Sequence, residues 1–118
     1  MIRKNIVQVG SHGSFSVMLP VTEEGGSITI GSGPFWIAGK EYELQEDESF
    51  LHDPKVVRTD AYLVMDAGMV RVVVDRMKAG MVPLAARERF TVLHKVLSIL
   101  ETSPGSFTMY VTNISPGD

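Results

Sequence analysis

Cysteine is absent from this chain. Its absence excludes disulfide bonds, thiolate metal ligands and cysteine nucleophiles. Positive charge is also scarce, since 11 Lys and Arg stand against 14 Asp and Glu, and the formal net charge at pH 7 is -3. A protein that neutralises a phosphate backbone carries an excess of basic residues. We therefore expect no nucleic-acid partner.

Long hydrophobic runs are missing as well. A membrane-spanning helix needs about 20 consecutive, mainly apolar residues, and the unbroken apolar runs of this chain are far shorter. The first residues, MIRKNIVQV, include two basic side chains but no apolar stretch of signal-peptide length. We expect a protein that is made and assembled in a cytoplasm and has no membrane partner.

What the chain does have is the composition of a folded globular protein. Hydrophobic residues make up 44% of it and charged residues 21%, which is not the balance of a disordered chain. A chain of 118 residues is long enough for one hydrophobic core without covalent staples. We expect a single domain, residues 1–118.

Several short segments have the β-branched content and alternation of strands, and glycine or proline ends most of them. These predicted strands are Ile2–Val9, Phe15–Leu19, Ser27–Ile30 and Ser106–Ile114. By contrast, the segment from Gln45 to Lys55 is acidic and irregular, and it predicts an exposed loop.

The stretch GPFWIAGKEYEL predicts a hairpin with Gly39 at its tip. The two-residue loop is either residues 38–39 or residues 39–40. Both registers place Phe35, Ile37 and Tyr42 on one face of the hairpin. Trp36 then lies on the other face, beside an acidic residue.

A second hairpin is predicted by TDAYLVMDAGMVRVVVD, residues 59–75. A three-residue loop, residues 66–68, with Gly68 in the left-handed position of a bulge, pairs Met65 with Met69. In that register one face carries the predicted core residues Tyr62, Val64, Val70, Val72 and Val74. The opposite face carries Leu63, Arg71 and Val73, and we interpret it as a candidate contact surface.

From Pro83 the hydrophobic period changes to that of a helix. On a helical wheel, residues 85–101 separate into a polar arc and a broad apolar arc that includes Phe90, Leu93 and Leu97. Pro83 suits a first helical turn, and Ser103-Pro-Gly105 is a stop signal. We predict a mainly β fold of sandwich-like or barrel-like antiparallel hairpins, with one C-terminal amphipathic helix at about residues 83–102. A pair of strands there, and so an all-β fold, is the alternative.

No catalytic, cofactor-binding or metal-binding motif emerges. The histidines His12, His52 and His94 are isolated in the sequence, and no two have the spacing of a zinc site. We expect His94 on the polar arc of the helix and His52 in a surface loop. The acidic residues 41–48 do not have the spacing of an EF-hand, and Gly31-Ser-Gly33 does not continue into a phosphate-binding loop. We predict no enzyme activity and no cofactor.

The stretches ITIGSGPFWIAGKEYEL and RTDAYLVMDAGMVRVVVD resemble the small β-rich domains of tail appendages, baseplates and head decorations in tailed bacteriophages. In such domains a strand ending in a glycine turn precedes an extended strand, a loop and a hairpin of the type Tyr-Leu-Val-x-Asp-x-Gly. The resemblance covers Ile28 to Asp75, about half of the chain. It implies a structural role in a virion, symmetric assembly with copies of itself and other virion proteins, and no catalysis.

Three functions are therefore in competition. The first is a non-enzymatic structural component of a phage-like particle that acts through oligomeric contacts. The second is a carbohydrate- or cell-surface-binding module with Trp36 as its platform, and the third is a small hydrolase with a site built from scattered residues. For the first function the candidate interface residues are Trp36, Leu63, Arg71 and Phe90.

Overall fold

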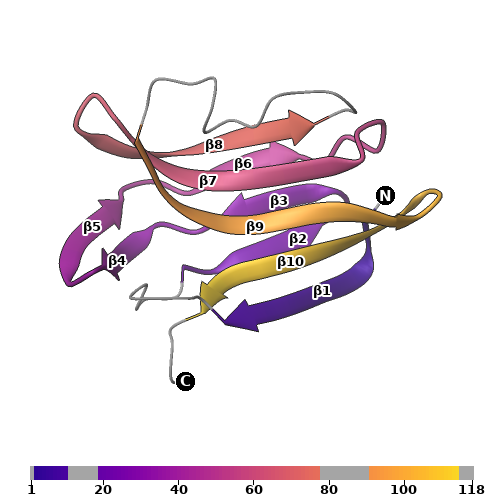
Figure 1. Ribbon diagram of the computed structural model, residues 1–118, viewed down its shortest axis with the longest axis horizontal. Coiled ribbons are helices and arrows are strands. Elements are labelled where there is room, and N and C mark those ends of the chain that lie inside the picture. Colours follow the sequence, from indigo (N-terminus) through magenta and orange to yellow (C-terminus); the bar gives the residue numbers. More distant parts are fainter. Residues whose placement is uncertain (1, 11–18, 78–90, 115–118) are drawn as a thin grey trace.

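The protein folds into two facing layers of β-strands with a hairpin at one end (Figure 1). The structure, a computed structural model, describes residues 2–10, 19–77 and 91–114. Its strands are β1 (Ile2–Gly10), β2 (Val21–Glu24), β3 (Ser27–Ile30), β4 (Gly33–Ile37), β5 (Lys40–Leu44), β6 (Glu48–Leu51), β7 (Arg58–Asp66), β8 (Met69–Met77), β9 (Thr91–Ser103) and β10 (Ser106–Ile114). The mainly β prediction is confirmed, and no described residue is helical.

The larger layer is a five-stranded sheet in the order β1-β10-β9-β7-β8, called the large sheet below. Its neighbouring strands are antiparallel except for β1, which pairs parallel to β10. The smaller layer is the three-stranded antiparallel sheet β2-β3-β6, called the small sheet. The β4–β5 hairpin pairs with neither sheet and lies at the left end of the molecule in Figure 1.

One hydrophobic core joins both sheets and the hairpin. The small sheet contributes Ile28 and Ile30, and the hairpin contributes Phe35 and Leu44. The large sheet contributes the inward-facing residues Ala61, Leu63, Val96, Leu97, Ile99, Phe107, Met109 and Val111. All of these side chains are at most 2% exposed, so the layers are held together mainly by apolar burial.

The β4–β5 hairpin confirms the sequence prediction in detail. Ile37 pairs with Lys40, which leaves Ala38 and Gly39 as the two-residue loop. Both loop residues have positive φ, 53° and 79°, as a type I′ turn requires. The Phe35 and Tyr42 rings stack with their centroids 5.5 Å apart, on the face that packs toward the core.

The register predicted for the β7–β8 hairpin is wrong by one residue. Asp66 pairs with Met69, so the loop has two residues, Ala67 and Gly68, with φ of 51° and 80°. The left-handed Gly68 is confirmed, but there is no bulge at this turn. Since a slip of one residue exchanges the two faces of a strand, Leu63 lies on the core face and is fully buried.

The helix predicted at residues 83–102 is wrong where the structure describes it, because residues 91–103 form β9. The remainder of that helix lies outside the described residues, as do Phe90 and the predicted strand Phe15–Leu19 except for Leu19, which is not in a strand. Two irregularities in the pairing of β7 with β9 leave Val96 and Leu93 as extra residues on β9. Each such bulge shifts the alternation by one position. Apolar pairs therefore recur every three to four residues, which imitates a helical period.

The predicted acidic loop at Gln45–Lys55 is also partly wrong, because Glu48–Leu51 forms β6. Phe50 and Glu48 are half-buried while Ser49 and Leu51 are exposed, so this strand has the alternation of a half-buried edge strand. Among the residues that the structure describes, no helix is long and apolar enough to cross a membrane.

Candidate functional site

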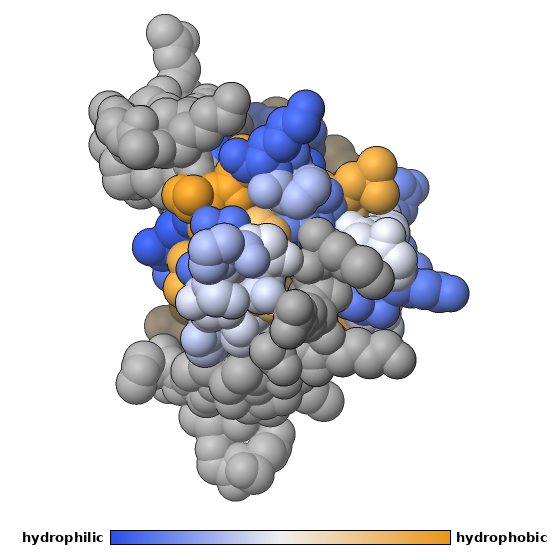
Figure 2. All heavy atoms as spheres, turned by 90° about the vertical axis from the view of Figure 1, so that its right-hand side faces the viewer, coloured by the Kyte–Doolittle hydropathy of each residue, from blue (hydrophilic) through white to orange (hydrophobic). Residues whose placement is uncertain are grey.

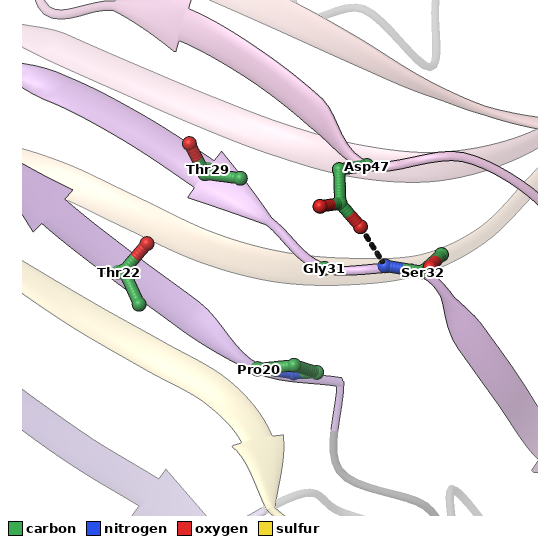
Figure 3. Close-up of a pocket in the computed structure, with 6 residues that line it drawn as sticks. All are labelled: Pro20, Thr22, Thr29, Gly31, Ser32 and Asp47. Atoms are coloured by element: carbon green, nitrogen blue, oxygen red, sulfur yellow. Dashed lines mark hydrogen bonds between the residues drawn. The ribbon is translucent and has the colours of Figure 1, made fainter.

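A hollow of about 230 Å³ lies at one end of the small sheet (Figure 3). We call it the Asp47 hollow. It is lined by Pro20, Thr22, Thr29, Gly31, Ser32 and Asp47. Thr22 comes from β2 and Thr29 from β3, while the other four residues belong to the segments next to the strand ends. The hollow is thus built from three segments of the chain, residues 20–22, residues 29–32 and Asp47.

The shape of the Asp47 hollow depends on a glycine. The backbone N–H of Gly31 donates to the carbonyl oxygen of Pro20 at 2.7 Å. A Cβ atom added at Gly31 would stand 2.6 Å from Cγ of Pro20, which is closer than such atoms approach. Only glycine therefore permits this contact between the two chain segments at the end of the small sheet.

The carboxylate of Asp47 is held by the opposite loop. Its Oδ1 accepts a hydrogen bond from the backbone N–H of Ser32 at 2.7 Å, and Figure 3 shows the side chain pointing toward that amide. This bond orients the carboxylate but leaves its charge unneutralised. Nearby, Thr29 Oγ1 and Ser49 Oγ are 2.7 Å apart on the outer face of the small sheet.

The chemistry of the Asp47 hollow is that of a hydrogen-bond acceptor. A carboxylate only accepts, and threonine hydroxyls both accept and donate. No basic side chain among the described residues lines the hollow. Such a lining suits a cationic group or a polyol better than an anion, because an anion would face an unscreened carboxylate.

A second, smaller hollow of about 180 Å³ lies between the β5–β6 connection and the start of β8. Its lining is Leu44, Gln45, Glu46, Glu48, Met69, Val70 and Arg71. The predicted interface residue Arg71 is exposed here and donates to Asp66 Oδ2 at 2.7 Å. Met69 beside it is 54% exposed.

The four predicted interface residues have different environments. Trp36 is half-buried on β4, opposite Glu41 on β5, and the residue next to it, Phe35, points into the core. Leu63 is fully buried in the core of the monomer, so its assignment to a contact surface is wrong. Phe90 lies outside the described residues, and Arg71 alone lines a hollow. Because Leu63 is buried, the three described residues do not form one exposed patch.

Both described histidines are less exposed than the sequence predicted. His52 is 9% exposed and packs edge-on against Phe107, with ring centroids 4.4 Å apart. Neither of its ring nitrogens has a hydrogen-bond partner within the described part of the chain. Burial away from water lowers the pKa of His52. His94 is a half-buried residue of β9 whose Nε2 bonds the Thr112 carbonyl oxygen at 2.6 Å. Burial also lowers the pKa of His94.

His52 belongs to the end of the sandwich that carries the β6–β7 and β9–β10 connections. Leu51 and Val57 near it are 67% and 52% exposed. Figure 2 shows this end, where apolar residues form separate small groups among polar ones. Scattered apolar residues of this kind are normal on a protein surface. Among the described residues, no group of three or more metal-ligating side chains is placed to hold a metal ion.

A buried polar cluster lies on the outer face of the large sheet. Asp60 is 1% exposed and accepts hydrogen bonds from Ser98 Oγ at 2.6 Å and from Arg58 Nε at 2.9 Å. Asp75, directly opposite on β8, is fully buried. Burial raises the pKa of Tyr62, and the two carboxylates add to this effect. Ser98 of β9 donates to Asp60 of β7, so this cluster ties β7 and β9 together.

Sequence reasoning missed the Asp47 hollow, although it had singled out both of its halves. Gly31-Ser-Gly33 does not match a phosphate loop, and the acidic stretch predicts Asp47 in an exposed loop. The available signal is a glycine that directly follows β3 and stands 16 residues before Asp47. Only the pairing of β3 with β6 brings the two segments together.

Comparison with known proteins adds one finding. No protein-family model and no curated protein matches this chain. A search of solved structures finds the crystal structure of the gene 22 product of the Bacillus subtilis SPP1 phage. The superposition has a TM-score of 0.70, covers 97% of this chain and 93% of that chain, and has 14% sequence identity. The two chains share a fold.

Proposed function

We propose that this protein is a non-enzymatic structural component of a phage-like particle, acting through symmetric contacts between copies. The observation that carries the proposal is the fold shared with a phage gene product along nearly the whole of both chains. Fold alone does not determine function, so the surfaces of the molecule must support the same conclusion.

The hollows support a role in assembly rather than in small-molecule chemistry. Pockets that enclose small molecules usually have volumes of roughly 300 Å³ or more and are mostly apolar. The Asp47 hollow and its neighbour measure about 230 and 180 Å³, and both contain carboxylates. They are of a size to receive single side chains from a partner protein.

Trp36 supplies the candidate anchor of the interface. It is half-buried on a hairpin outside both sheets, and tryptophan is enriched at the energetic centres of protein interfaces. The remainder of its surface would be buried by a neighbouring copy. Arg71 and Met69 beside the smaller hollow are a second candidate contact. The protein would then be found in the virion, assembled in the host cytoplasm with its own copies and with other virion proteins.

The test is the mass of the protein in solution. Sedimentation velocity should show a discrete oligomer of the 12.9 kDa chain. Replacing Trp36 by Ala should weaken association by about 30-fold, which corresponds to the roughly 2 kcal/mol of an interface tryptophan. The circular dichroism of the variant should be unchanged. A wild-type monomer at every concentration would contradict the proposal.

Carbohydrate binding is the second candidate. A partly exposed tryptophan that stands next to an exposed carboxylate, Glu41, is an arrangement in which a sugar ring can stack while its hydroxyls are bound. Binding to a glycan array that is lost in Trp36→Ala and retained in Trp36→Phe would favour this function. Absence of glycan binding together with stable oligomers would favour the first.

A further inference from the structure

The charge of the molecule is divided unequally between its layers. Residues 19–57 form the small sheet, the hairpin and their connections, together called the small layer below. They carry eight acidic and two basic residues, a net charge of -6. The acidic residues are Glu23, Glu24, Glu41, Glu43, Glu46, Asp47, Glu48 and Asp53. The segments that form the large sheet, residues 2–10, 58–77 and 91–114, carry four acidic and six basic residues, a net charge of +2.

The acidic residues of this segment have no ion pairs within the described part of the chain. The described ion pairs are Arg58–Asp60 and Arg71–Asp66, both on the large sheet. In the small layer, carboxylates accept hydrogen bonds from backbone N–H groups, as Asp47 does from Ser32. Backbone bonds fix the direction of a carboxylate without cancelling its charge. The small layer therefore retains its negative potential.

Within this negatively charged layer, the Asp47 hollow provides a concave surface with an oriented carboxylate. Oδ1 of Asp47 is held by Ser32, so Oδ2 remains for a ligand. Thr22 and Thr29 line the same hollow, and Thr29 Oγ1 lies 2.7 Å from Ser49 Oγ. An ammonium group has three N–H donors and no acceptor, so it is suited to bind the second carboxylate oxygen of Asp47.

The large sheet offers one described basic side chain that is not engaged within the chain. Arg58 and Arg71 are paired with carboxylates, and Arg76 donates to the Leu51 carbonyl oxygen at 2.9 Å. Lys95 has no ion pair within the described part of the chain. It lies directly opposite Tyr62 in the β7–β9 ladder, and so on the outer face of the large sheet, the face away from the small sheet.

We propose that the Asp47 hollow of one molecule receives the Lys95 ammonium group of a second copy of this chain. This inference rests on the proposed function and names two residues that form the contact between copies. The hollow and Lys95 belong to opposite layers, so the contact is head-to-tail and joins the acidic layer of one molecule to the large sheet of the next. Repeated contacts of this type form a ring when the rotation closes and a helical tube when it does not.

Neutralising one carboxylate tests the contact. Asp47→Asn keeps the acceptor for the Ser32 amide and removes the charge. It should raise the dissociation constant of the oligomer about tenfold or more, because the charge pair is desolvated in the interface. Glu43→Gln removes the same charge from an exposed position on β5 outside both hollows, and it should change the constant less than about threefold.

A charge exchange identifies the partner residue. Asp47→Lys and Lys95→Asp should each be monomeric at concentrations where the wild type assembles. An equimolar mixture of the two should assemble again, because each hollow then meets a residue of opposite charge. Sedimentation velocity measures all four samples, and unchanged circular dichroism shows that each variant is folded.

The outcomes separate this inference from the proposed function. A wild-type oligomer that persists in Asp47→Asn and Asp47→Lys overturns the contact and leaves the structural role intact. If both single variants dissociate but their mixture does not reassemble, Lys95 is not the partner and the inference is wrong. If the wild type is monomeric throughout, both fail together.

Discussion

The two layers of this molecule treat their carboxylates differently. On the large sheet, Asp60 is buried and bonded to Arg58 and Ser98, and the exposed Asp66 is paired with Arg71. In residues 19–57, eight acidic side chains have no ion pair within the described part of the chain, and most of them are exposed. One layer uses its charged groups inside the fold, and the other presents them at its surface.

The difference indicates which charges stabilise the protein. A buried carboxylate must have partners, because an unpaired charge in the interior is very costly. An exposed carboxylate is solvated and contributes little to folding, even when a cation is near. Charges of the large sheet should therefore matter for stability, and charges of the small layer should matter for association.

The largest expected effect comes from breaking the buried polar cluster on the outer face of the large sheet. Asp60→Ala removes the acceptor of Ser98 and the partner of Arg58, and should lower the free energy of unfolding by about 2–3 kcal/mol. We place it below the full cost of breaking a buried ion pair because the Arg58 side chain is 42% exposed. Asp47→Ala should change that free energy by less than about 1 kcal/mol. Urea unfolding measures both.

If Asp60→Ala and Asp47→Ala lower the free energy of unfolding by equal amounts, the two layers do not differ in how their charges affect stability. A stable Asp60→Ala protein would mean that water replaces its partners and that the cluster is not part of the core.

The next effect concerns the two Ala-Gly turns, one on the large sheet and one on the hairpin. Gly68 has a φ of 80° and Gly39 a φ of 79°, a region that β-branched residues avoid. Gly68→Val and Gly39→Val should each cost about 1 kcal/mol or more. Because Phe35 and Leu63 belong to one core, both variants should shift a single cooperative melting transition.

Ala67 provides the matched control for the turn. Its φ is 51°, and asparagine tolerates this conformation better than alanine. Ala67→Asn should raise the melting temperature slightly. Two separate melting transitions in either glycine variant would show that the hairpin and the large sheet do not share one cooperative core.

The smallest expected effect is on the pH dependence of stability. Burial lowers the pKa of His52 in the folded protein, so the unfolded chain binds a proton more readily than the folded one. Stability should then be constant well above pH 6.5 and fall as the pH drops below about 6.5, the ordinary pKa of histidine. Urea midpoints between about pH 8 and pH 5 measure this fall. His52→Leu should reduce it, and an unchanged profile would contradict the assignment.

Much of the architecture follows from the sequence, and the errors have physical causes. Gly39 stands between two stretches of alternating residues, so the sequence predicts the first hairpin and its two faces but leaves two registers open. The structure selects the one with Ala38 and Gly39 as the loop. At the second hairpin, Asp66 was assigned to the loop, although Ala67 adopts positive φ without being glycine. This one-residue error in register placed Leu63 on a surface in the prediction, whereas it lies in the core.

The helix error has a different cause. Two bulges on β9, at Val96 and Leu93, give the strand a spacing of apolar residues close to 3.6. A bulge depends on the partner strand, and no local pattern reveals it. For the same reason, the Asp47 hollow and the burial of His52 could not be predicted, since each depends on contacts between distant segments. The prediction of a phage-related fold did not depend on those details.

Hydrogen exchange tests most directly whether the small layer and the hollow face a partner. The protein is compared above and below its association midpoint. The account predicts that amides near Asp47, on β2 and β3, and near Lys95 gain protection on assembly, while the amides of β7, which lies between β9 and β8 in the large sheet, do not change. An oligomer that forms with unchanged exchange in residues 20–47 would contradict the account.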